Sequence, residues 1–329
     1  MNIYYHLSNY ISHRKSGLDY IKAIESLGWS IVNSVHQADL IIIHDDPLNY
    51  PAIIHSFGNI SLKKIISYSV WETEDLPKEY IEPLSMVDEI WTCSTYSANA
   101  FRKKFDNVKI LEHIVHSNSF SEEVLSKIRK KIKFNTENYY FYTIVDSINP
   151  RKNLVSVLDC FISTFKKHKN VFLVVKQYRH PLNLSSFSQI ISIENNLSEK
   201  EISALHHSCN CYISLHHSEA WGLSISEAMI SGNNVIATGY SGNMEYMNEK
   251  NSFPVNYILK NIQNKMCELI PLYTKKMKWA FPDLNHARYY MKKIYKRKEE
   301  KLINPYIGMD RFDFDTISRK IYTYINEKI

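Results

Sequence analysis

Short apolar runs alternate with longer amphipathic segments along most of the chain. The runs are rich in Ile, Val, Leu, Tyr and Phe, and they cover residues 2–7, 39–44, 64–70, 88–92, 139–145, 171–175, 190–193, 211–215 and 235–237. Apolar runs of this length, bounded by polar turns, are typical of buried strands. Helix-length segments lie between them, such as 154–167 and 223–230. Strands that alternate with helices predict an α/β fold with parallel sheets.

The remaining segments give less regular patterns. We expect a loop over residues 8–16, a helix from Gly17 to Leu27 that stops at Gly28, and a charged helix over 122–133. The apolar run 110–115 reads as one more strand. Residues 261–301 read as a basic helical tail broken at Phe281-Pro282-Asp283, and 315–328 as an amphipathic final helix. The polar turn 135–138 is the best candidate for a linker between two domains.

Residues 211–247 carry the densest chemistry of the chain. A strand, a loop, a helix, a second loop and a second strand follow one another there, as in a βαβ unit. Glu219 lies in the first loop and Glu227 in the helix, with seven residues between them, and a second glycine loop follows at Ser241-Gly242-Asn243. Open α/β sheets bind ligands at the carboxyl ends of their strands. We therefore expect both carboxylates and the helix N-terminus to face a ligand.

The E-x7-E spacing, the small-residue turn and the S-G-N-x-E-Y element resemble the donor-sugar site of retaining GT-B glycosyltransferases, in particular family 4. The resemblance implies two Rossmann-like domains whose parallel sheets face each other across a cleft. It implies a first domain over residues 1–134, a nucleotide-sugar domain over 135–311, and a final helix 312–329 that packs back on the first domain. Where the family has glycine after the first glutamate, this chain has Ala220.

The resemblance also assigns roles to residues. Glu219 would reach the transferred sugar, Glu227 would hold the ribose hydroxyls, and the helix N-terminus near Leu223 would face the diphosphate, which free N–H groups favour. The neighbours expected to share in donor binding are Trp221, Gly222, Leu223, Ser224, Ser241 and Gly242. The alternative is two solvated glutamates on a helix surface beside a packing turn.

Two further segments match the family's nucleotide site. Arg151 and Lys152 follow the strand 139–145 and resemble the pair of cations that neutralises the leaving diphosphate, although relatives space them about five residues apart. The alternative, a basic helix start on the surface, runs against the helix dipole. Ile193 and Leu197 precede a capping-box helix start at Ser198, and relatives hold the nucleotide base there.

The first third of the chain suggests an acceptor site. The series V-W-E-T-x-x-L-P and V-D-E-I-W-T-C-S resembles the N-terminal domain of certain bacterial polysaccharide transferases. Groups at predicted strand ends are acceptor-site candidates, namely His6, Asn9, His44, Asp45, Trp71 and Glu72. His44 fits best by position as a catalytic group near the transferred sugar. The alternative is that His44 caps a strand before the turn Asp45-Asp46-Pro47.

Composition and charge limit the cellular locations and partners that we expect for the protein. The 329 residues are 44% hydrophobic with a net charge of +6, and no apolar run approaches the length of a membrane span. The start MNIYYHLSNY lacks the features of a secretion signal, so we expect a cytoplasmic protein. We find no aromatic-interleaved basic patch and expect no nucleic-acid partner. The cationic run 292–298 could meet anionic lipid at the inner face of the membrane, although we favour a solvated helix face.

No metal site is expected. The Asp313-Phe314-Asp315 element matches a metal-binding D-x-D only superficially, because it lies near the chain end away from any strand terminus. The adjacent histidines 206–207 and 216–217 read as packing or cleft polarity, since neighbours in a strand point to opposite faces. The five cysteines show no zinc-type or disulfide spacing.

The sequence thus predicts a retaining, metal-independent glycosyltransferase without a cofactor. It would move a hexose-type sugar from a nucleotide-diphosphate donor, UDP or GDP type, to a glycan or lipid-linked glycan in bacterial surface polysaccharide synthesis. One alternative is a nucleotide-sugar epimerase of the same fold, which needs extra acid and base groups. The other is a non-catalytic relative that binds a nucleotide or glycan for a partner enzyme.

Overall fold

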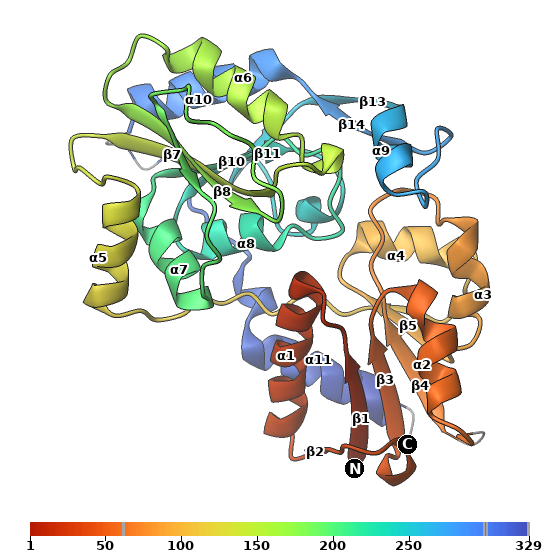
Figure 1. Ribbon diagram of the computed structural model, residues 1–329. Helices are drawn as coiled ribbons and strands as arrows, with labels where there is room; N and C mark the ends of the chain where they lie inside the picture. The colour runs from red at the N-terminus through yellow and green to blue at the C-terminus, as the bar shows by residue number, and fades with distance from the viewer. Residues whose placement is uncertain (61–62, 299, 301, 328–329) are drawn as a thin grey trace. The chain divides into compact units, whose positions relative to one another are not determined.

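The computed structural model describes residues 1–60, 63–298, 300 and 302–327. The chain divides into two compact units (Figure 1): unit 1 is Met1–Val115 with Asp310–Ile329, and unit 2 is His116–Met309. The division falls before helix α5 (Glu122–Lys131), whereas the expected boundary followed it. The reason is that α5 buries Leu125 and Ile128 and packs against α7 (Glu199–Ser208) of unit 2.

The described residues of unit 1 form a six-stranded parallel sheet. Its order is β2 (Ser30–Ile31), β1 (Asn2–Leu7), β3 (Leu40–His44), β4 (Lys64–Tyr68), β5 (Glu89–Thr92) and β6 (Val108–Ile110). The apolar run 110–115, expected as a strand, is not one beyond Ile110. Leu111, Ile114 and Val115 are buried core residues instead, and Val115 N donates to the backbone oxygen of Phe312.

Helix α1 (Ile11–Ser26) begins six residues earlier than expected, because Gly17 does not start the helix but lies inside it. A Cβ at this position would lie 2.3 Å from Leu7 Cδ1 and 2.9 Å from His44 Nδ1. Gly17 therefore permits α1 to pack closely over the carboxyl ends of β1 and β3. The predicted stop holds: Gly28 has a φ of +80°, a backbone conformation that ends a helix.

The other helices of unit 1 are α2 (Tyr50–Ser56), α3 (Ile81–Leu84), α4 (Thr95–Arg102) and α11 (Phe314–Asn326). Helix α11 packs against α1, and the rings of Trp29 and Tyr322 stack with their centroids 5.7 Å apart. The hydroxyl of Tyr324 donates to Ile110 O at 2.9 Å. The last two residues of the expected final helix, Lys328 and Ile329, lie outside the described residues.

The described residues of unit 2 form a second six-stranded parallel sheet. Its order is β12 (Phe253–Val255), β11 (Asn234–Thr238), β10 (Cys211–Ser214), β7 (Tyr139–Asp146), β8 (Val171–Tyr178) and β9 (Ile190–Ile193). Helices α6 (Leu154–Phe165) and α10 (Leu284–Lys296) cover one face, and α7 and α8 (Leu223–Ile230) cover the other (Figure 1). Phe141, Phe161 and Met291 belong to the core under α6 and α10.

The expected helical tail 261–301 is confirmed in its second part, where α10 begins directly after the expected break at 281–283, and is wrong at 278–281, which are strand. Strands β13 (Tyr257–Asn261) and β14 (Lys278–Pro282) form an antiparallel ribbon, and only the short helix α9 (Asn264–Leu269) separates them. Trp279 stacks on the ring of His217 with centroids 4.6 Å apart, and Ala280 N donates to His217 O at 2.9 Å. These tertiary contacts favour strand over the helical preference of the segment. Lys301 lies outside the described residues.

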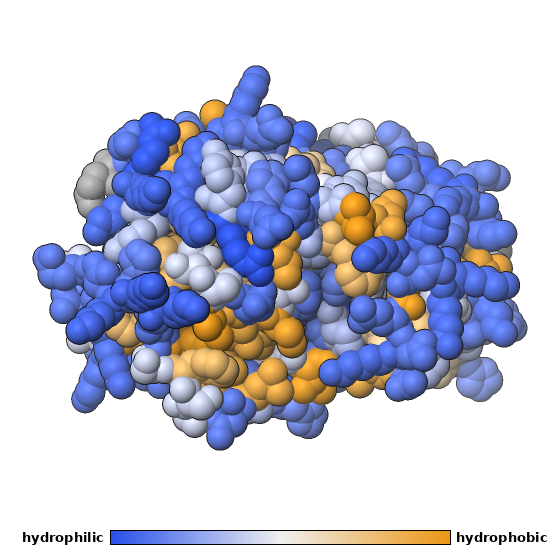
Figure 2. Space-filling model, turned by 90° about the horizontal axis from the view of Figure 1, so that it is seen from above, coloured by the Kyte–Doolittle hydropathy of each residue, from blue (hydrophilic) through white to orange (hydrophobic). Residues whose placement is uncertain are grey.

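Polar side chains cover most of the face seen in Figure 2, with apolar side chains gathered in smaller patches between them. Across the described part of the chain, we find no helix with the length and apolar character needed to cross a bilayer.

Candidate functional site

The loop between β10 and α8, residues 215–222, is fixed by the segment that follows β7. There the turn η4 (Pro150–Lys152) is capped by Asn149, whose side chain accepts from Arg151 N at 3.0 Å. Asn153 then adopts a left-handed conformation with a φ of 50°, and its Nδ2 donates to Leu215 O at 2.8 Å. Because β7 and β10 are neighbours in the sheet, their carboxyl ends bring these two segments together.

Arg151 and Lys152 both bind the carboxylate of Glu219. Arg151 Nη1 lies 2.9 Å from Glu219 Oε2, and Lys152 Nζ lies 2.5 Å from Glu219 Oε1. Arg151 Nη1 also donates to Ser218 O at 2.7 Å. Burial alone would raise the pKa of Glu219, but the attraction of Lys152 and Arg151 outweighs it and lowers the pKa to about 2. The three predicted residues thus form one buried ionic cluster with a surplus of positive charge.

The glycine loop after β11 holds the other side of Glu219. Glu219 N donates to Ser241 Oγ at 2.8 Å, and Gly242 N donates to Glu219 O at 2.8 Å. A Cβ on Gly242 would lie 1.7 Å from Ala220 O, so only glycine allows this approach. Ser241 itself has a φ of 76° and a ψ of −151°, a region populated almost only by glycine. This strained backbone is maintained by the surrounding contacts.

Helix α8 presents an uncapped N-terminus beside the cluster. Its N-cap is Gly222, with a φ of 88° and no side-chain hydrogen bond to the first turn. The first N–H groups of a helix, here those of Leu223 and Ser224, have no partner within the helix and favour an anion. Tyr246 fixes the entry to the helix, because its hydroxyl donates to Trp221 O at 2.8 Å and lies 2.9 Å from Gly222 O.

Trp221 differs from our expectation of a ligand contact. Its ring is only 2% exposed, its Nε1 donates to Ser226 Oγ at 3.1 Å, and it packs on the ring of Tyr246. The side chain is therefore core, and the backbone of the residue is what lies at the start of α8.

The remaining nucleotide-site candidates lie in the same unit. Glu227 is in the second turn of α8, with a side chain that is 13% exposed and an Oε2 that lies 3.7 Å from His206 Nε2. Ile193 ends β9 and is buried, and Leu197 is half-buried in the loop that follows. The predicted capping box after that loop is present, because Ser198 and Glu201 bond reciprocally at the start of α7.

His44, our candidate for a catalytic group, lies inside unit 1. Its ring is 1% exposed, its Nδ1 lies 2.9 Å from the hydroxyl of Tyr5, and its Nε2 lies 3.5 Å from Ser16 Oγ. Burial holds the pKa of His44 well below its usual range, so the ring is neutral. A side chain with no exposed surface cannot touch a ligand, and we leave His44 out of the proposed site.

The sequence missed His13, which covers His44 in the first turns of α1. The two rings have centroids 5.4 Å apart, and His13 Nδ1 is buried with no hydrogen-bond partner among the described residues. Burial lowers the pKa of His13, and the charges of Glu72, Asp45 and Asp46 partly oppose this shift. Residues 8–16 were expected as a loop, so His13 was not placed on a helix. In α1, His13 lies one turn before Gly17, on the side of the helix that approaches His44.

The other acceptor-site candidates have local partners. Asp45 Oδ1 accepts from Asn49 Nδ2 at 2.8 Å, and Asp45 Oδ2 lies 3.3 Å from His6 Nε2. Burial raises the pKa of Asp45, but these hydrogen bonds outweigh it and lower the pKa to about 2. Trp71 is buried, with its Nε1 donating to Thr73 Oγ1 at 2.6 Å.

The histidine pair 216–217 and the D-x-D element serve packing and capping. His216 lies between Ser214 Oγ at 3.1 Å and Asn243 Oδ1 at 3.0 Å, and His217 Nδ1 donates to Ala280 O at 2.6 Å. Asp313 caps α11 by accepting from Thr316 N at 2.7 Å.

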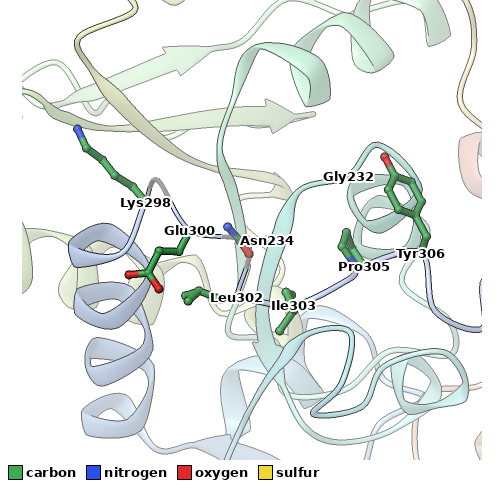
Figure 3. Close-up of a pocket in the computed structure, with 8 residues that line it drawn as sticks. All are labelled: Gly232, Asn234, Lys298, Glu300, Leu302, Ile303, Pro305 and Tyr306. Atoms are coloured by element: carbon green, nitrogen blue, oxygen red, sulfur yellow. The ribbon is translucent and has the colours of Figure 1, made fainter.

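A separate pocket of about 370 Å³ lies near the amino end of β11 (Figure 3). It is lined by Gly232, Asn234, Lys298, Glu300, Leu302, Ile303, Pro305 and Tyr306. The ionic cluster follows the carboxyl ends of β7 and β10, whereas this pocket lies at the amino-terminal end of the parallel strands. It contains none of the residues predicted for the site.

Comparisons with known proteins agree with this geometry. Residues 126–264, which include the ionic cluster and α8, match the family model described as "Glycosyl transferases group 1". No curated protein matches the chain by sequence. Among solved structures, HepE of Anabaena in complex with UDP and glucose is 13% identical with a TM-score of 0.71, and the match covers 99% of both chains.

Two other solved structures are similar. Sucrose-phosphate synthase of Thermosynechococcus elongatus has a TM-score of 0.68 at 9% identity, over 99% of this chain and 95% of its own. The pneumococcal O-GlcNAc transferase GtfA, in complex with UDP and GlcNAc, has a TM-score of 0.62 at 12% identity, over 95% of this chain and 60% of its own. At these identities the likeness shows the fold, and the chain has the GT-B fold of glycosyltransferases.

Proposed function

We propose that the protein is a retaining glycosyltransferase that takes its sugar from a nucleotide-diphosphate donor bound in unit 2. The observation that carries the proposal is the cluster of Arg151, Lys152 and Glu219 beside the uncapped start of α8. The match of residues 126–264 to a glycosyltransferase family model supports it. Because two of the similar structures contain UDP, UDP-sugars are the first donors to test.

The cluster can receive the leaving diphosphate. Two cations and one carboxylate leave a net charge of +1, and the free N–H groups of α8 add a partial positive charge. Preorganised groups of this kind stabilise negative charge that develops in a transition state. No residue need give or take a proton for this role.

Lys152 and Arg151 differ in what they can do. The side chain of Lys152 is 27% exposed, whereas that of Arg151 is 10% exposed and also bonds Ser218 O. We assign Lys152 to the phosphate oxygens and Arg151 to holding the loop and one oxygen of Glu219. When Lys152 turns to the phosphate, Glu219 Oε1 becomes able to accept a hydroxyl of the sugar.

Glu219 then acts as a sugar-positioning group. Its low pKa keeps it ionised, and two cations reduce its nucleophilicity, so a covalent sugar intermediate on this residue is not part of the proposal. The resemblance to family 4 implies that the donor phosphate accepts the acceptor proton on the same face of the sugar. Glu227 would hold the ribose, and the loop from Ile193 to Leu197 would hold the base.

The acceptor is a glycan or lipid-linked glycan of a bacterial surface polysaccharide in this proposal. His13 and Glu72 replace His44 as the groups of unit 1 to examine for acceptor binding, because both residues are half-buried, whereas His44 is buried. We further propose a cytoplasmic location, in which the basic run 292–298 is a solvated helix face and peripheral contact with the membrane is the alternative.

The direct test is nucleotide release from a panel of UDP- and GDP-sugars, with and without chelator. We expect release from one donor class that survives chelation, and a product whose anomeric configuration equals that of the donor. Loss of release on chelation would refute the metal-independent proposal, and an inverted product would refute retention. Binding without release from any donor, with any glycan added, would favour the non-catalytic alternative.

A C2-epimerised or C4-epimerised nucleotide sugar among the products would instead indicate the epimerase. The burial of His44 weakens that alternative, because His44 and Glu72 were the acid and base groups available to it.

A further inference from the structure

We propose that His206 is a positioning residue that holds the carboxylate of Glu227 for a ribose, and that Tyr142 and Asn233 set the tautomer of His206 for this purpose. The proposal rests on the proposed function, in which Glu227 binds the donor ribose. It is carried by a chain of hydrogen bonds whose directions can be worked out from one end to the other.

The starting point is the amide of Asn233, in the loop between α8 and β11. Asn233 Nδ2 lies 2.8 Å from His206 O, and a backbone carbonyl can only accept. The orientation of the amide is therefore fixed, with its nitrogen on the side of His206. The same Nδ2 lies 2.7 Å from the hydroxyl oxygen of Tyr142, so Asn233 also donates to Tyr142.

The hydroxyl of Tyr142 is in turn hydrogen-bonded to the imidazole of His206. It lies 2.6 Å from His206 Nδ1. If Nδ1–H were the donor, the lone pair of Nε2 would face the carboxylate of Glu227, which is unfavourable, so the phenol proton is assigned to the bond with Nδ1. Burial raises the pKa of Tyr142 well above its usual range, so the hydroxyl keeps its proton. An Nδ1 that accepts a hydrogen bond carries no proton, and the neutral ring must then carry it on Nε2.

The Nε2–H of His206 points toward α8. The residue is 1% exposed, and Nε2 has no hydrogen-bond partner among the described residues. Glu227 Oε2 lies 3.7 Å away, too far for a hydrogen bond but within ionic contact distance. A buried N–H without an acceptor is unfavourable. A small movement of the Glu227 side chain toward His206 would give this N–H an acceptor and give the carboxylate a donor, so it is favoured.

This arrangement deepens the proposed function by naming the ligand class of the site. In this proposal Oε2 is engaged by His206, and the Glu227 carboxylate accepts two neighbouring hydroxyls of the ligand. A ribose offers such a diol, and a 2′-deoxyribose does not. The site should therefore prefer ribonucleoside diphosphates to their 2′-deoxy analogues, and His206 should be needed for that preference.

The test compares two amide substitutions at one position. In His206→Gln the side-chain nitrogen can reach the place of Nε2, whereas in His206→Asn it reaches only the place of Nδ1. Calorimetry would measure the dissociation constants of UDP, GDP and their 2′-deoxy forms for both variants and the wild type. We expect His206→Asn to weaken binding of the preferred ribonucleotide about tenfold, the loss of one hydrogen bond to a charged group, with little change for the deoxy form. His206→Gln should recover most of the loss.

A second measurement does not depend on binding. ¹⁵N NMR of the histidine-labelled protein reports the tautomer, and we expect His206 protonated on Nε2 in the wild type and mixed in Tyr142→Phe. A proton on Nδ1 in the wild type would overturn the proposal, even if His206→Asn failed to fold.

The results distinguish a failure of the positioning role of His206 from a failure of the proposed function. Equal losses for both amide variants, or equal losses for the ribo and deoxy forms, would show that His206 only supports the fold of unit 2 and would overturn its positioning role alone. A wild-type protein that binds neither UDP nor GDP would instead overturn the proposed function, and this inference with it.

Discussion

Replacing Glu219 with glutamine tests the ionic cluster most directly. The change removes the negative charge between Arg151 and Lys152 and keeps the shape of the side chain. Breaking a buried ion pair on one side costs about 3–5 kcal/mol. Arg151 keeps its bond to Ser218 O, and the partly exposed Lys152 can reach water, so we expect the lower end, about 3 kcal/mol.

The pH dependence identifies the cause of that loss. The pKa of Glu219 is lowered from 4.5 to about 2 in the folded state. The stabilisation by the ionised carboxylate is therefore complete above about pH 4.5 and disappears as the pH falls toward 2. Wild type and Glu219→Gln should differ most near pH 7 and converge in acid.

Calorimetric melting at several pH values would measure both effects. A domain the size of unit 2 loses roughly 2–4 °C in Tm per kcal/mol, so we expect a decrease of about 6–12 °C at pH 7. Glu249→Gln is the matched control, because Glu249 is exposed in the same unit and should leave the Tm nearly unchanged. If Glu219→Gln melted with the control, or if the difference were the same at pH 3 as at pH 7, the cluster would not stabilise the fold as argued.

Three further predictions concern single side chains of unit 2. Lys152→Met should reduce nucleotide release about 10²–10³-fold in a turnover assay and leave the Tm within a few degrees, whereas an unchanged rate would remove Lys152 from the phosphate site. Gly242→Ala should destabilise by roughly 3 kcal/mol in urea unfolding, because its Cβ would lie 1.7 Å from Ala220 O; an unaffected midpoint would contradict the close approach. Burial lowers the pKa of Lys176 from 10.5 to about 8, so below pH 8 the buried ammonium destabilises the fold by about 3 kcal/mol. Lys176→Met should therefore be more stable than wild type at pH 7, and the gain should shrink as the pH rises toward 10.5; a constant gain would point to packing instead.

The sequence predicted well what depends on local pattern and on the chemistry of strand ends. Most strands of both sheets follow from short apolar runs, although β2 and β12 were not expected and β6 overlaps the expected strand 110–115 only at Ile110. Arg151 and Glu219 were expected in one donor site because of their resemblance to the donor-site residues of family 4. The sequence does not say which strands are neighbours. That β7 lies beside β10 is a property of the whole sheet, and only this adjacency brings Arg151 within 2.9 Å of Glu219.

The failures have one physical origin, which is that long-range contacts override local preference. The ribbon at Trp279 was expected as helix, and it is strand because the ring packs on His217. His44 was expected at a ligand and is buried because α1 begins early and crosses over it at Gly17. The link from Tyr142 through His206 to Glu227 joins residues far apart in sequence, and no local spacing signals it.

The resting cluster also constrains how a donor can bind. Pairing both cations with Glu219 reduces the attraction available to a diphosphate, yet an unpaired buried guanidinium would be less stable still. The loop around Glu219 cannot relax to resolve this conflict, because Gly242 contacts Ala220 O and the strained Ser241 holds Glu219 N. Of the three charged side chains, that of Lys152 is the most exposed, so we expect it to adjust most readily. Donor binding should therefore be an exchange, in which Lys152 leaves one carboxylate oxygen for the phosphate and that oxygen becomes the acceptor for the sugar.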